Sequence, residues 1–288
     1  MAGVKIVVDS TCDLPREMRE SHDITMVPLR VHFDPEVYLD YIEMSPSQFY
    51  EKLRTSKVHP RTSQPSPAEF AEVYARLGSS GDEIISIHLS EKMSGTLQSA
   101  VLGKSMVEGV NVHVVDSRSA SLGTGLMAVA AARAAREGRL VPDILSMLER
   151  IRRSMELYFV VDTLDYLARN GRIGRAQHLL GSLLQFKPIL TIDEDGYVSS
   201  FEKVRGKSRA FSRLMEIVRE RVPEGAEIVA AAVHSEAPAE AERLVAELGA
   251  SYNIREKVVT ELGPVIGSHV GPGTVAVMCY ETKVLDVA

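Results

Sequence analysis

The stretch Val4-Lys5-Ile6-Val7-Val8-Asp9-Ser10, near the amino terminus, carries the clearest sign of the fold. Its β-branched apolar run stops abruptly at two small polar residues, which is typical of a buried parallel strand whose carboxyl end opens into a loop. The pattern returns at residues 83–88 and 110–115, and the latter run ends at Asp116-Ser117. Helical stretches separate these strands, so the first half predicts a parallel α/β sheet.

Serine and proline residues mark where the helices of this half begin. Ser45-Pro46 predicts a helix to about residue 55, and Ser66-Pro67 predicts another that ends near Gly78. We expect Asp13 to cap a short helix beginning at Pro15. The prolines at positions 65 and 67 favour an extended backbone for residues 62–64.

The second half predicts a mixed sheet. Asp195-Gly196 is a strong hairpin turn between the extended segments 189–192 and 197–203. Around it, the sequence predicts helices at 176–185, 207–221 and 237–248, and strands at 158–161, 227–233, 252–259 and 274–280. We therefore expect two α/β domains, residues 1–155 with a parallel Rossmann-like sheet and residues 156–288 with a mixed sheet.

Composition excludes several classes of protein. The 288 residues are 45% hydrophobic and carry a net charge of −6, which argues against disorder and against a general nucleic-acid binder. No apolar run approaches the length of a membrane span, and the first residues do not predict a signal peptide. Two cysteines are too few for a disulfide framework or a structural zinc site, so a reducing cytoplasm is expected.

Polar loops follow the strand ends, where open parallel sheets bind ligands. In the loop Met93-Ser94-Gly95-Thr96, Gly95 allows a ligand to approach the backbone, and the following helix start favours a carboxylate or phosphate. The Ser94 hydroxyl is then a candidate ligand-binding group. A structural cap of the helix by Ser94 explains the same spacing.

Two glycine-containing segments are further candidates. Residues 263–273 hold four glycines and two prolines, which predict an irregular, rigid loop presenting Ser268 and His269. A tight turn with an exposed histidine is the alternative. Residues 170–175 place Arg172 between glycines, where it would bind a carboxylate or phosphate, or would lie in a solvated turn.

The sequence excludes three motifs that are typical of catalytic or cofactor-binding sites. Residues 123–128 fit the letters of a dinucleotide site but stand too far from the preceding strand. Gly206-Lys207-Ser208 lacks the first glycine of a P-loop, because Phe201 stands there, and the serine hydrolase elbow is absent. No histidine, cysteine or carboxylate spacing suits a metal. We therefore expect no cofactor and no metal.

Taken together and in order, the motifs resemble the DegV family of bacterial fatty-acid-binding proteins. The matching stretches span most of the chain: Val8-Asp9-Ser10 with Asp13-Leu14, Thr62-Ser63-Gln64-Pro65-Ser66, Ser94-Gly95-Thr96 with Gln98-Ser99-Ala100, Val115-Asp116-Ser117, Asp162-Thr163-Leu164, Leu167, Gly171-Arg172-Ile173-Gly174, Lys187-Pro188-Ile189-Leu190, His234-Ser235 and residues 263–273.

The resemblance implies a fold and a ligand. Members bind one long-chain fatty acid in a tunnel between two α/β domains. By this match Thr62 and Ser94 hydrogen-bond the carboxylate, and Arg172 and His269 belong to the network around it. Gly95 and Ser268 complete the implied carboxylate-binding set.

The resemblance also implies a partner. In many members an ATP-dependent fatty-acid kinase phosphorylates the bound acid, and the acyl phosphate feeds phospholipid synthesis. The chain would then be a carrier and not an enzyme. Arg205, in the basic segment 201–207, is our candidate for docking the ATP-binding kinase subunit.

Two other functions compete with the carrier. One is a serine acyl hydrolase or transferase that uses Ser94 as nucleophile and His269 as base. The other is a nucleotide-binding regulator with phosphate at the helix start after Gly95.

Overall fold

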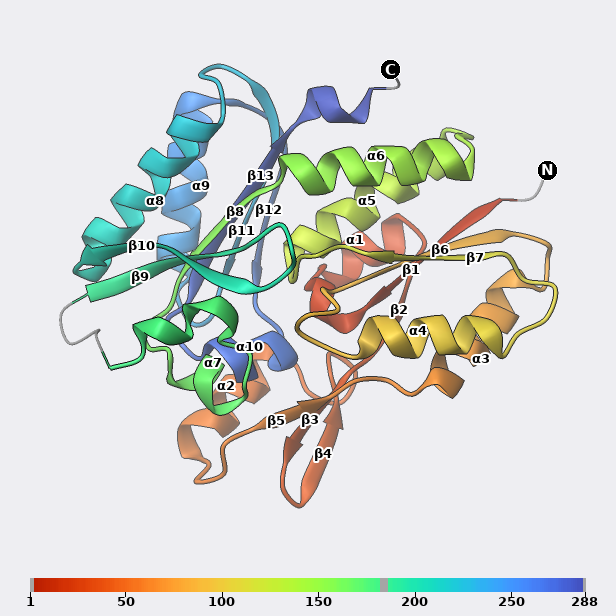
Figure 1. Ribbon diagram of the computed structural model, residues 1–288, viewed down its shortest axis with the longest axis horizontal. Helices are drawn as coiled ribbons and strands as arrows, with labels where there is room; N and C mark the ends of the chain where they lie inside the picture. Colours follow the sequence, from red (N-terminus) through yellow and green to blue (C-terminus); the bar gives the residue numbers. More distant parts are fainter. Residues whose placement is uncertain (1–2, 182–185, 287–288) are drawn as a thin grey trace.

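The computed structural model describes residues 3–181 and 186–286, which form three sheets (Figure 1). The first sheet has four parallel strands in the order β2-β1-β6-β7, which confirms the parallel sheet predicted for the first half. Its strands are β1 (Val4–Asp9), β2 (Ile24–Val27), β6 (Glu83–His88) and β7 (Val112–Asp116).

Both faces of this sheet are covered, which explains the continuous apolar run in β1. Ile6 and Val8 pack in one core with residues of α5 (Leu122–Arg136). Val7, on the opposite face, shares a second core with α3 (Pro67–Gly78) and α4 (Thr96–Ser105). Every position of a strand buried on both faces favours an apolar side chain.

The second sheet has six strands in the order β10-β9-β8-β13-β11-β12, and it confirms the predicted mixed sheet. Only the pair β11–β12 is parallel. The strands are β8 (Glu156–Val160), β9 (Phe186–Ile192), β10 (Val198–Arg205), β11 (Glu227–His234), β12 (Asn253–Glu261) and β13 (Val275–Glu281). The predicted hairpin joins β9 to β10, with Gly196 at φ 90°.

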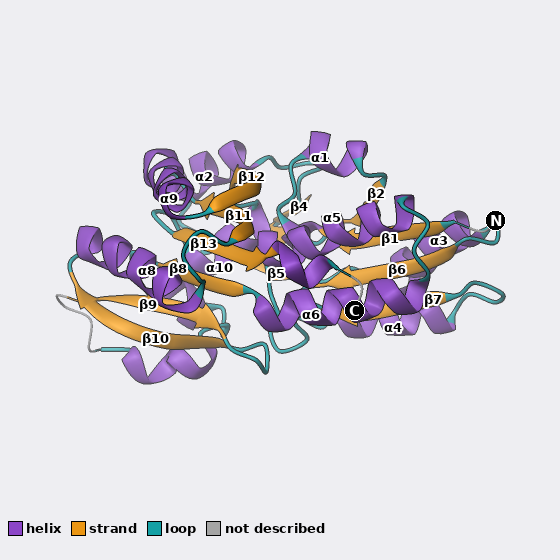
Figure 2. Cartoon of the chain, turned by 90° about the horizontal axis from the view of Figure 1, so that it is seen from above, coloured by secondary structure: helices purple, strands orange, loops and turns teal. Residues whose placement is uncertain are grey.

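Strands β8 and β13 present different neighbours on their two faces. Tyr158 and Val277 pack in a core with α8 (Lys207–Arg221) and α9 (Pro238–Ser251). Phe159 and Met278 belong instead to the core that contains the parallel sheet and α5. Seen from above, the two large sheets lie side by side, with α8 and α9 on the side of the mixed sheet away from the parallel sheet (Figure 2).

The third sheet was not predicted. It is antiparallel, in the order β4-β3-β5, and consists of β3 (Arg30–Phe33), β4 (Glu36–Leu39) and β5 (Arg61–Ser63). Residues 24–33 are divided between β2 of the first sheet and β3 of this one. In register, Thr62 of β5 pairs with Val31, so this small sheet fixes the position of Thr62.

The remaining elements connect these sheets. They are η1 (Ser10–Cys12), α1 (Arg16–Ser21), α2 (Pro46–Thr55), α6 (Val141–Ser154), α7 (Asp165–Arg169), η2 (Gly174–Leu179), α10 (Pro264–Val270) and η3 (Thr282–Leu285). The helices α2 and α3 begin where the sequence predicts, and Ser45 and Ser66 form their capping boxes. The strands of the mixed sheet come from residues 156–281, and those of the other two sheets come from residues 4–116.

Three local predictions differ from the structure. The helix expected at residues 176–185 is a 3₁₀ helix at Gly174–Leu179, and residues 182–185 lie outside the described part. Asp13 does not cap α1, because it ends η1 in the left-handed region at φ 50°. The expected irregular loop at 263–273 contains α10, which begins at Pro264, ends at Val270 and is capped by Gly271 at φ 73°.

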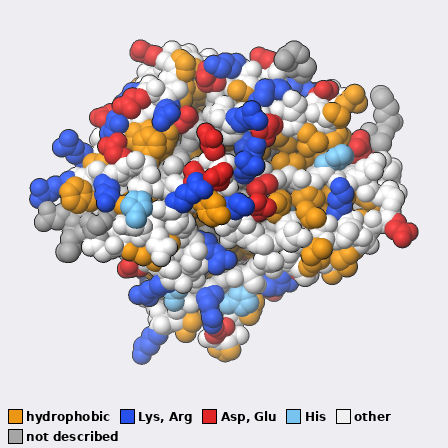
Figure 3. All heavy atoms as spheres, viewed as in Figure 1, with side chains coloured by type: hydrophobic (Ala, Val, Ile, Leu, Met, Phe, Trp, Pro, Cys, Tyr) orange, Lys and Arg blue, Asp and Glu red, His pale blue; other side chains and the backbone are white. Residues whose placement is uncertain are grey.

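The surface carries both charge and apolar side chains. On the face shown in Figure 3, acidic and basic side chains are interspersed, with hydrophobic side chains among them. Val101, Leu102 and Met106, on or just after α4, are exposed. None of the helices in residues 3–181 and 186–286 has the length and apolar character needed to cross a membrane.

A buried carboxyl group makes the stability of the fold depend on pH. Asp40 is fully buried beside Ser10, and burial raises its pKa from 3.8 to about 8. Between these values the unfolded chain releases a proton that the folded chain keeps, so the free energy of unfolding falls as pH rises. We expect Asp40→Asn to gain about 2–4 kcal/mol of stability relative to the parent between pH 5 and pH 8.

Urea unfolding at both pH values measures this difference. The exposed Asp165 provides a control, since Asp165→Asn removes a carboxylate without changing a buried site. Equal changes in the two variants would contradict a role for burial of Asp40.

Candidate functional site

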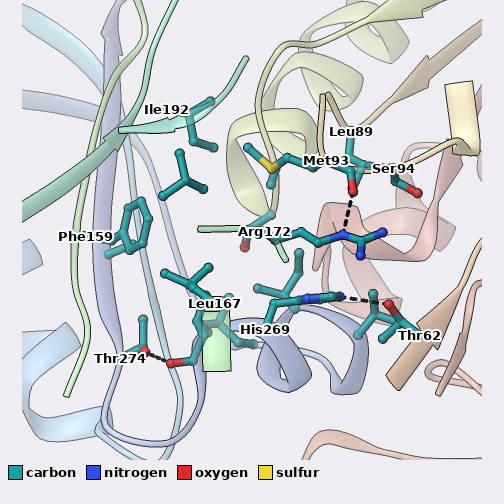
Figure 4. Close-up of a pocket in the computed structure, with 18 of the residues that line it drawn as sticks. Thr62, Leu89, Met93, Ser94, Phe159, Leu167, Arg172, Ile192, His269 and Thr274 are labelled. Atoms are coloured by element: carbon teal, nitrogen blue, oxygen red, sulfur yellow. Dashed lines mark hydrogen bonds between the residues drawn. The ribbon is translucent and has the colours of Figure 1, made fainter. Parts of the chain in front are cut away.

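A cavity of about 310 Å³ lies between the carboxyl ends of the parallel strands and the face of the mixed sheet opposite α8 and α9 (Figure 4). This volume is at the lower end of the range found for small-molecule sites. The cavity is lined by Leu29, Thr62, Ser63, Gln64, Leu89, Met93, Ser94, Ala120, Ser121, Leu157, Phe159, Leu167, Arg172, Ile192, Val198, Val233, Leu262, Val265, Ile266, His269, Val270, Thr274, Ala276 and Met278.

One side of the cavity is apolar because of strand alternation. Leu157 and Phe159 of β8 and Ala276 and Met278 of β13 are alternate residues, so they share the face that borders the cavity. Ile192 of β9 extends this surface. An apolar ligand placed here would exchange water for a hydrocarbon wall.

The polar groups of the cavity lie on the opposite side, among further apolar lining residues such as Leu89. Thr62 and Ser94 lie there with the tip of Arg172, away from Phe159, as Figure 4 shows. The β5 strand carries Thr62, the loop before α4 carries Ser94, and α10 carries His269. The Thr62 hydroxyl oxygen lies 2.8 Å from Nε2 of His269, which joins the third sheet to α10.

His269 is neutral at physiological pH. Burial, together with the nearby positive charge of Arg172, lowers the pKa of its imidazole from 6.5 to about 3. Its Nδ1 is buried without a hydrogen-bond partner in the described residues. The histidine therefore has a polar atom available for a ligand and contributes no charge of its own.

Arg172 supplies positive charge to the polar side. Its Nε donates to the backbone oxygen of Met93 at 3.1 Å, and Nη1 donates to that of Asn170 at 2.7 Å. Within the described ranges no carboxylate forms an ion pair with it. Because its described bonds go to backbone carbonyls, the guanidinium is held in place while its charge remains available to an anion.

The chain matches one known protein family over almost its whole length. The family model described as "Uncharacterised protein, DegV family" matches residues 3–282. The chain belongs to the DegV family. This confirms the resemblance seen in the sequence.

Relatives of this DegV-family chain match it over nearly its whole length. Protein DegV of Bacillus subtilis is 40% identical over 281 residues, covering 97% of this chain and all of the relative. A solved Thermus thermophilus structure, described as showing fatty acid binding of a DegV family protein, is 38% identical with a TM-score of 0.92, covering 97% of this chain and 99% of that one.

A second solved structure also matches the chain over nearly its whole length. DegV of Bacillus subtilis, described as a fatty acid binding protein, is 38% identical with a TM-score of 0.91 and covers 98% of this chain and 100% of that one. These matches confirm the α/β architecture of the DegV-family chain.

The predicted site residues fall into two groups. Thr62, Ser94, Arg172 and His269 of the DegV-family chain line the same cavity, although they are far apart in sequence. Ser268 is not a lining residue, since its buried hydroxyl donates to the backbone oxygen of Pro264 at 2.7 Å. The Ser268 hydroxyl therefore forms its hydrogen bond within α10.

Packing against Gln64 explains why position 95 is a glycine, which the sequence did not indicate. A Cβ atom at this position would lie 2.4 Å from the side-chain oxygen of Gln64, so glycine makes room for that amide. Gly95 is not among the lining residues, whereas Gln64 is. Arg205, at the end of β10, also lies outside the lining set.

The geometry does not join Ser94 to His269 as a nucleophile and base. The Ser94 hydroxyl bonds to that of Thr96 at 2.9 Å and accepts from the Thr96 backbone N–H at 3.3 Å. Nε2 of His269 is bonded to Thr62 instead. Ser94 is also not the N-cap of α4, because Gly95 takes that position.

A second set of serine, histidine and aspartate does not reach the cavity. Nε2 of His88 lies 2.7 Å from the Ser86 hydroxyl, and Nδ1 lies 3.0 Å from Asp9. All three residues are fully buried, and none lines the cavity of the DegV-family chain. Their bonds therefore hold neighbouring strands together.

Sequence reasoning missed part of the site. Gln64 and Ser63 line the cavity beside Thr62 and stand in one of the stretches that carried the resemblance. The apolar lining residues gave no signal of their own, because a side chain facing a cavity and one facing a packed core have the same hydrophobic pattern.

Proposed function

We propose that this chain binds one long-chain fatty acid. Its carboxylate is held by Thr62, Ser94, Arg172 and His269, and its hydrocarbon chain extends over the apolar face of the mixed sheet. The observation that carries this proposal is a single cavity with an apolar wall on one side and hydroxyls, a neutral imidazole and a held guanidinium on the other. The two solved relatives described above as fatty-acid-binding support it.

The energetics agree with such a ligand. A sixteen-carbon acid has fourteen methylenes, whose burial contributes roughly 11 kcal/mol at about 0.8 kcal/mol each before ordering costs. A buried carboxylate without partners would cancel much of this gain. Charge-assisted bonds from Arg172 and hydrogen bonds from the hydroxyls offset that cost.

The partner and the place of action are also part of the proposal. The chain acts as a carrier in the cytoplasm and presents the carboxylate to an ATP-dependent fatty-acid kinase, which forms an acyl phosphate for phospholipid synthesis. Arg172, at the exposed polar side of the cavity, leaves the carboxylate near the surface where a kinase would meet it. We do not propose that the chain itself catalyses a reaction.

Mass spectrometry of the purified protein tests the binding. Under native conditions we expect one fatty acid for each chain, released on denaturation and identified in the organic extract. A protein that yields no lipid, and that neither palmitate nor oleate protects from thermal unfolding, would overturn the proposal.

A substitution at Arg205 tests the kinase surface. Arg205 lies at the end of the edge strand β10, and its side chain is exposed. We expect Arg205→Ala to reduce the rate of acyl-phosphate formation by the kinase and to leave fatty-acid affinity unchanged, because a rim charge mainly affects association. Lys203→Ala removes a charge two residues earlier on the same strand and serves as the control. If both variants are phosphorylated at the parental rate, Arg205 is outside the interface.

A further inference from the structure

The carboxylate of Asp13 lies where four segments of the chain meet. Asp13 is 1% exposed and follows η1 at the carboxyl end of β1. Its Oδ1 accepts from the Tyr41 hydroxyl at 2.9 Å and from the backbone N–H of Gly263 at 3.0 Å. Its Oδ2 accepts from the Ser121 hydroxyl at 2.6 Å. Each donor belongs to a different segment.

All three segments lead to the cavity. Ser121 lines the cavity and precedes α5. Gly263 is the N-cap of α10, which carries His269. Tyr41 follows β4 of the small antiparallel sheet, whose strand β5 carries Thr62. Asp13 itself is not a lining residue, so it contacts the site only through these neighbours.

The backbone around this carboxylate is strained. Asp13, Tyr41 and Ser121 have φ values of 50°, 60° and 55°, and they are three of the six non-glycine residues with positive φ in the described chain. Such conformations persist where surrounding contacts hold them, and they cluster at functional sites. Gly263 completes the junction, because a Cβ atom there would lie 2.4 Å from the Tyr41 ring.

We propose that Asp13 is a positioning residue for the carboxylate-binding side of the cavity. By holding Gly263 and Tyr41 together, it fixes α10 against the small sheet and keeps His269 within hydrogen-bond distance of Thr62. This inference rests on the proposed function for its binding readout. The positioning role of Asp13 depends on hydrogen-bond geometry and not on charge. An asparagine at this position can therefore replace it, because its side chain has one oxygen for Tyr41 and Gly263 and an amide N–H for the Ser121 hydroxyl. Asparagine also tolerates the left-handed region.

Four variants separate positioning from general stability. Asp13→Ala removes all three bonds, Asp13→Asn restores them, and Tyr41→Phe removes one. Tyr74→Phe is the matched control, since it removes a buried tyrosine hydroxyl whose 2.8 Å bond to Ser86 joins α3 to β6 and involves neither α10 nor the small sheet. Two quantities are measured on fully folded protein: the palmitate affinity, and the imidazole ¹⁵N shifts of His269 at pH 7 without ligand, assigned with His269→Gln.

We expect Asp13→Ala to weaken palmitate binding by about tenfold or more, which corresponds to loss of a hydrogen bond to a charged group. Tyr41→Phe is expected to have a smaller effect in the same direction, and both variants should shift the His269 signals. Asp13→Asn and Tyr74→Phe should keep the parental affinity and spectrum. If Asp13→Ala does not fold, the comparison of Tyr41→Phe with Tyr74→Phe decides.

Two results would overturn the inference. One is an unchanged His269 spectrum in Asp13→Ala and Tyr41→Phe, and the other is a loss in Asp13→Asn as large as in Asp13→Ala. Failure of the proposed function would be recognised separately. Parent protein that binds no fatty acid would overturn that proposal, while the ligand-free His269 spectra would still test the role of Asp13.

Discussion

Ala276→Phe is expected to abolish fatty-acid binding while the protein remains folded. Ala276 is on β13 and faces the cavity, so a phenyl ring would occupy space that the hydrocarbon chain needs. Displacing only four methylenes removes about 3 kcal/mol at about 0.8 kcal/mol each, which is at least about hundredfold in affinity. Displacement of a fluorescent fatty acid measures the affinity, and thermal unfolding without ligand checks the fold.

A smaller change at the same position gives a graded control. Ala276→Val adds two methyl groups and suits a strand. Its affinity for an eighteen-carbon acid should fall more than its affinity for a fourteen-carbon acid. Parental affinity of Ala276→Phe for every chain length would place the ligand outside this cavity.

Ser94→Ala is expected to weaken fatty-acid binding by about ten- to hundredfold, because a hydrogen bond to a charged group contributes about 1.5–3 kcal/mol. The apolar chain retains residual affinity. Stability should fall by less than about 1 kcal/mol, since the 3.3 Å contact with the Thr96 N–H is long and Gly95 is the N-cap. Calorimetric titration and urea unfolding of one variant provide both values.

Ser66→Ala is the matched control for this prediction. Ser66 is the true N-cap of α3, where it accepts from the backbone of Glu69, and it does not line the cavity. Its loss should cost about 1 kcal/mol of stability with affinity unchanged. If Ser94→Ala behaves in this way instead, its hydroxyl has a structural role only.

Much of the fold could be predicted because local signals and tertiary structure agree. The run at residues 4–8 is apolar at every position, as burial on both faces requires, and Asp195-Gly196 has the chemistry of a hairpin turn. The small sheet could not be predicted, since β5 has only three residues and no periodicity. The helix α10 was hidden by glycines that serve packing: a Cβ on Gly267 would lie 2.7 Å from the Tyr50 hydroxyl oxygen.

The site shows a similar limit. Thr62, Ser94, Arg172 and His269 were identified through ordered motifs, and folding brings them to one cavity. The predicted capping role of Asp13 is wrong because a carboxylate before a helix is a common cap, while its actual partners are up to 250 residues away in sequence. Contacts at such separation leave no local pattern.

The two faces of β8 and β13 have a consequence for how such a protein evolves. Side chains that face α8 and α9 are fixed by close packing, so changes there are removed by selection against unfolded protein. Their neighbours one residue along the strand border the cavity and also pack in the core that contains α5, so a substitution there changes the space for a ligand at a folding cost that grows with the change in volume. The shape of the cavity can therefore change through single nucleotide changes along two strands, within the limit that folding sets.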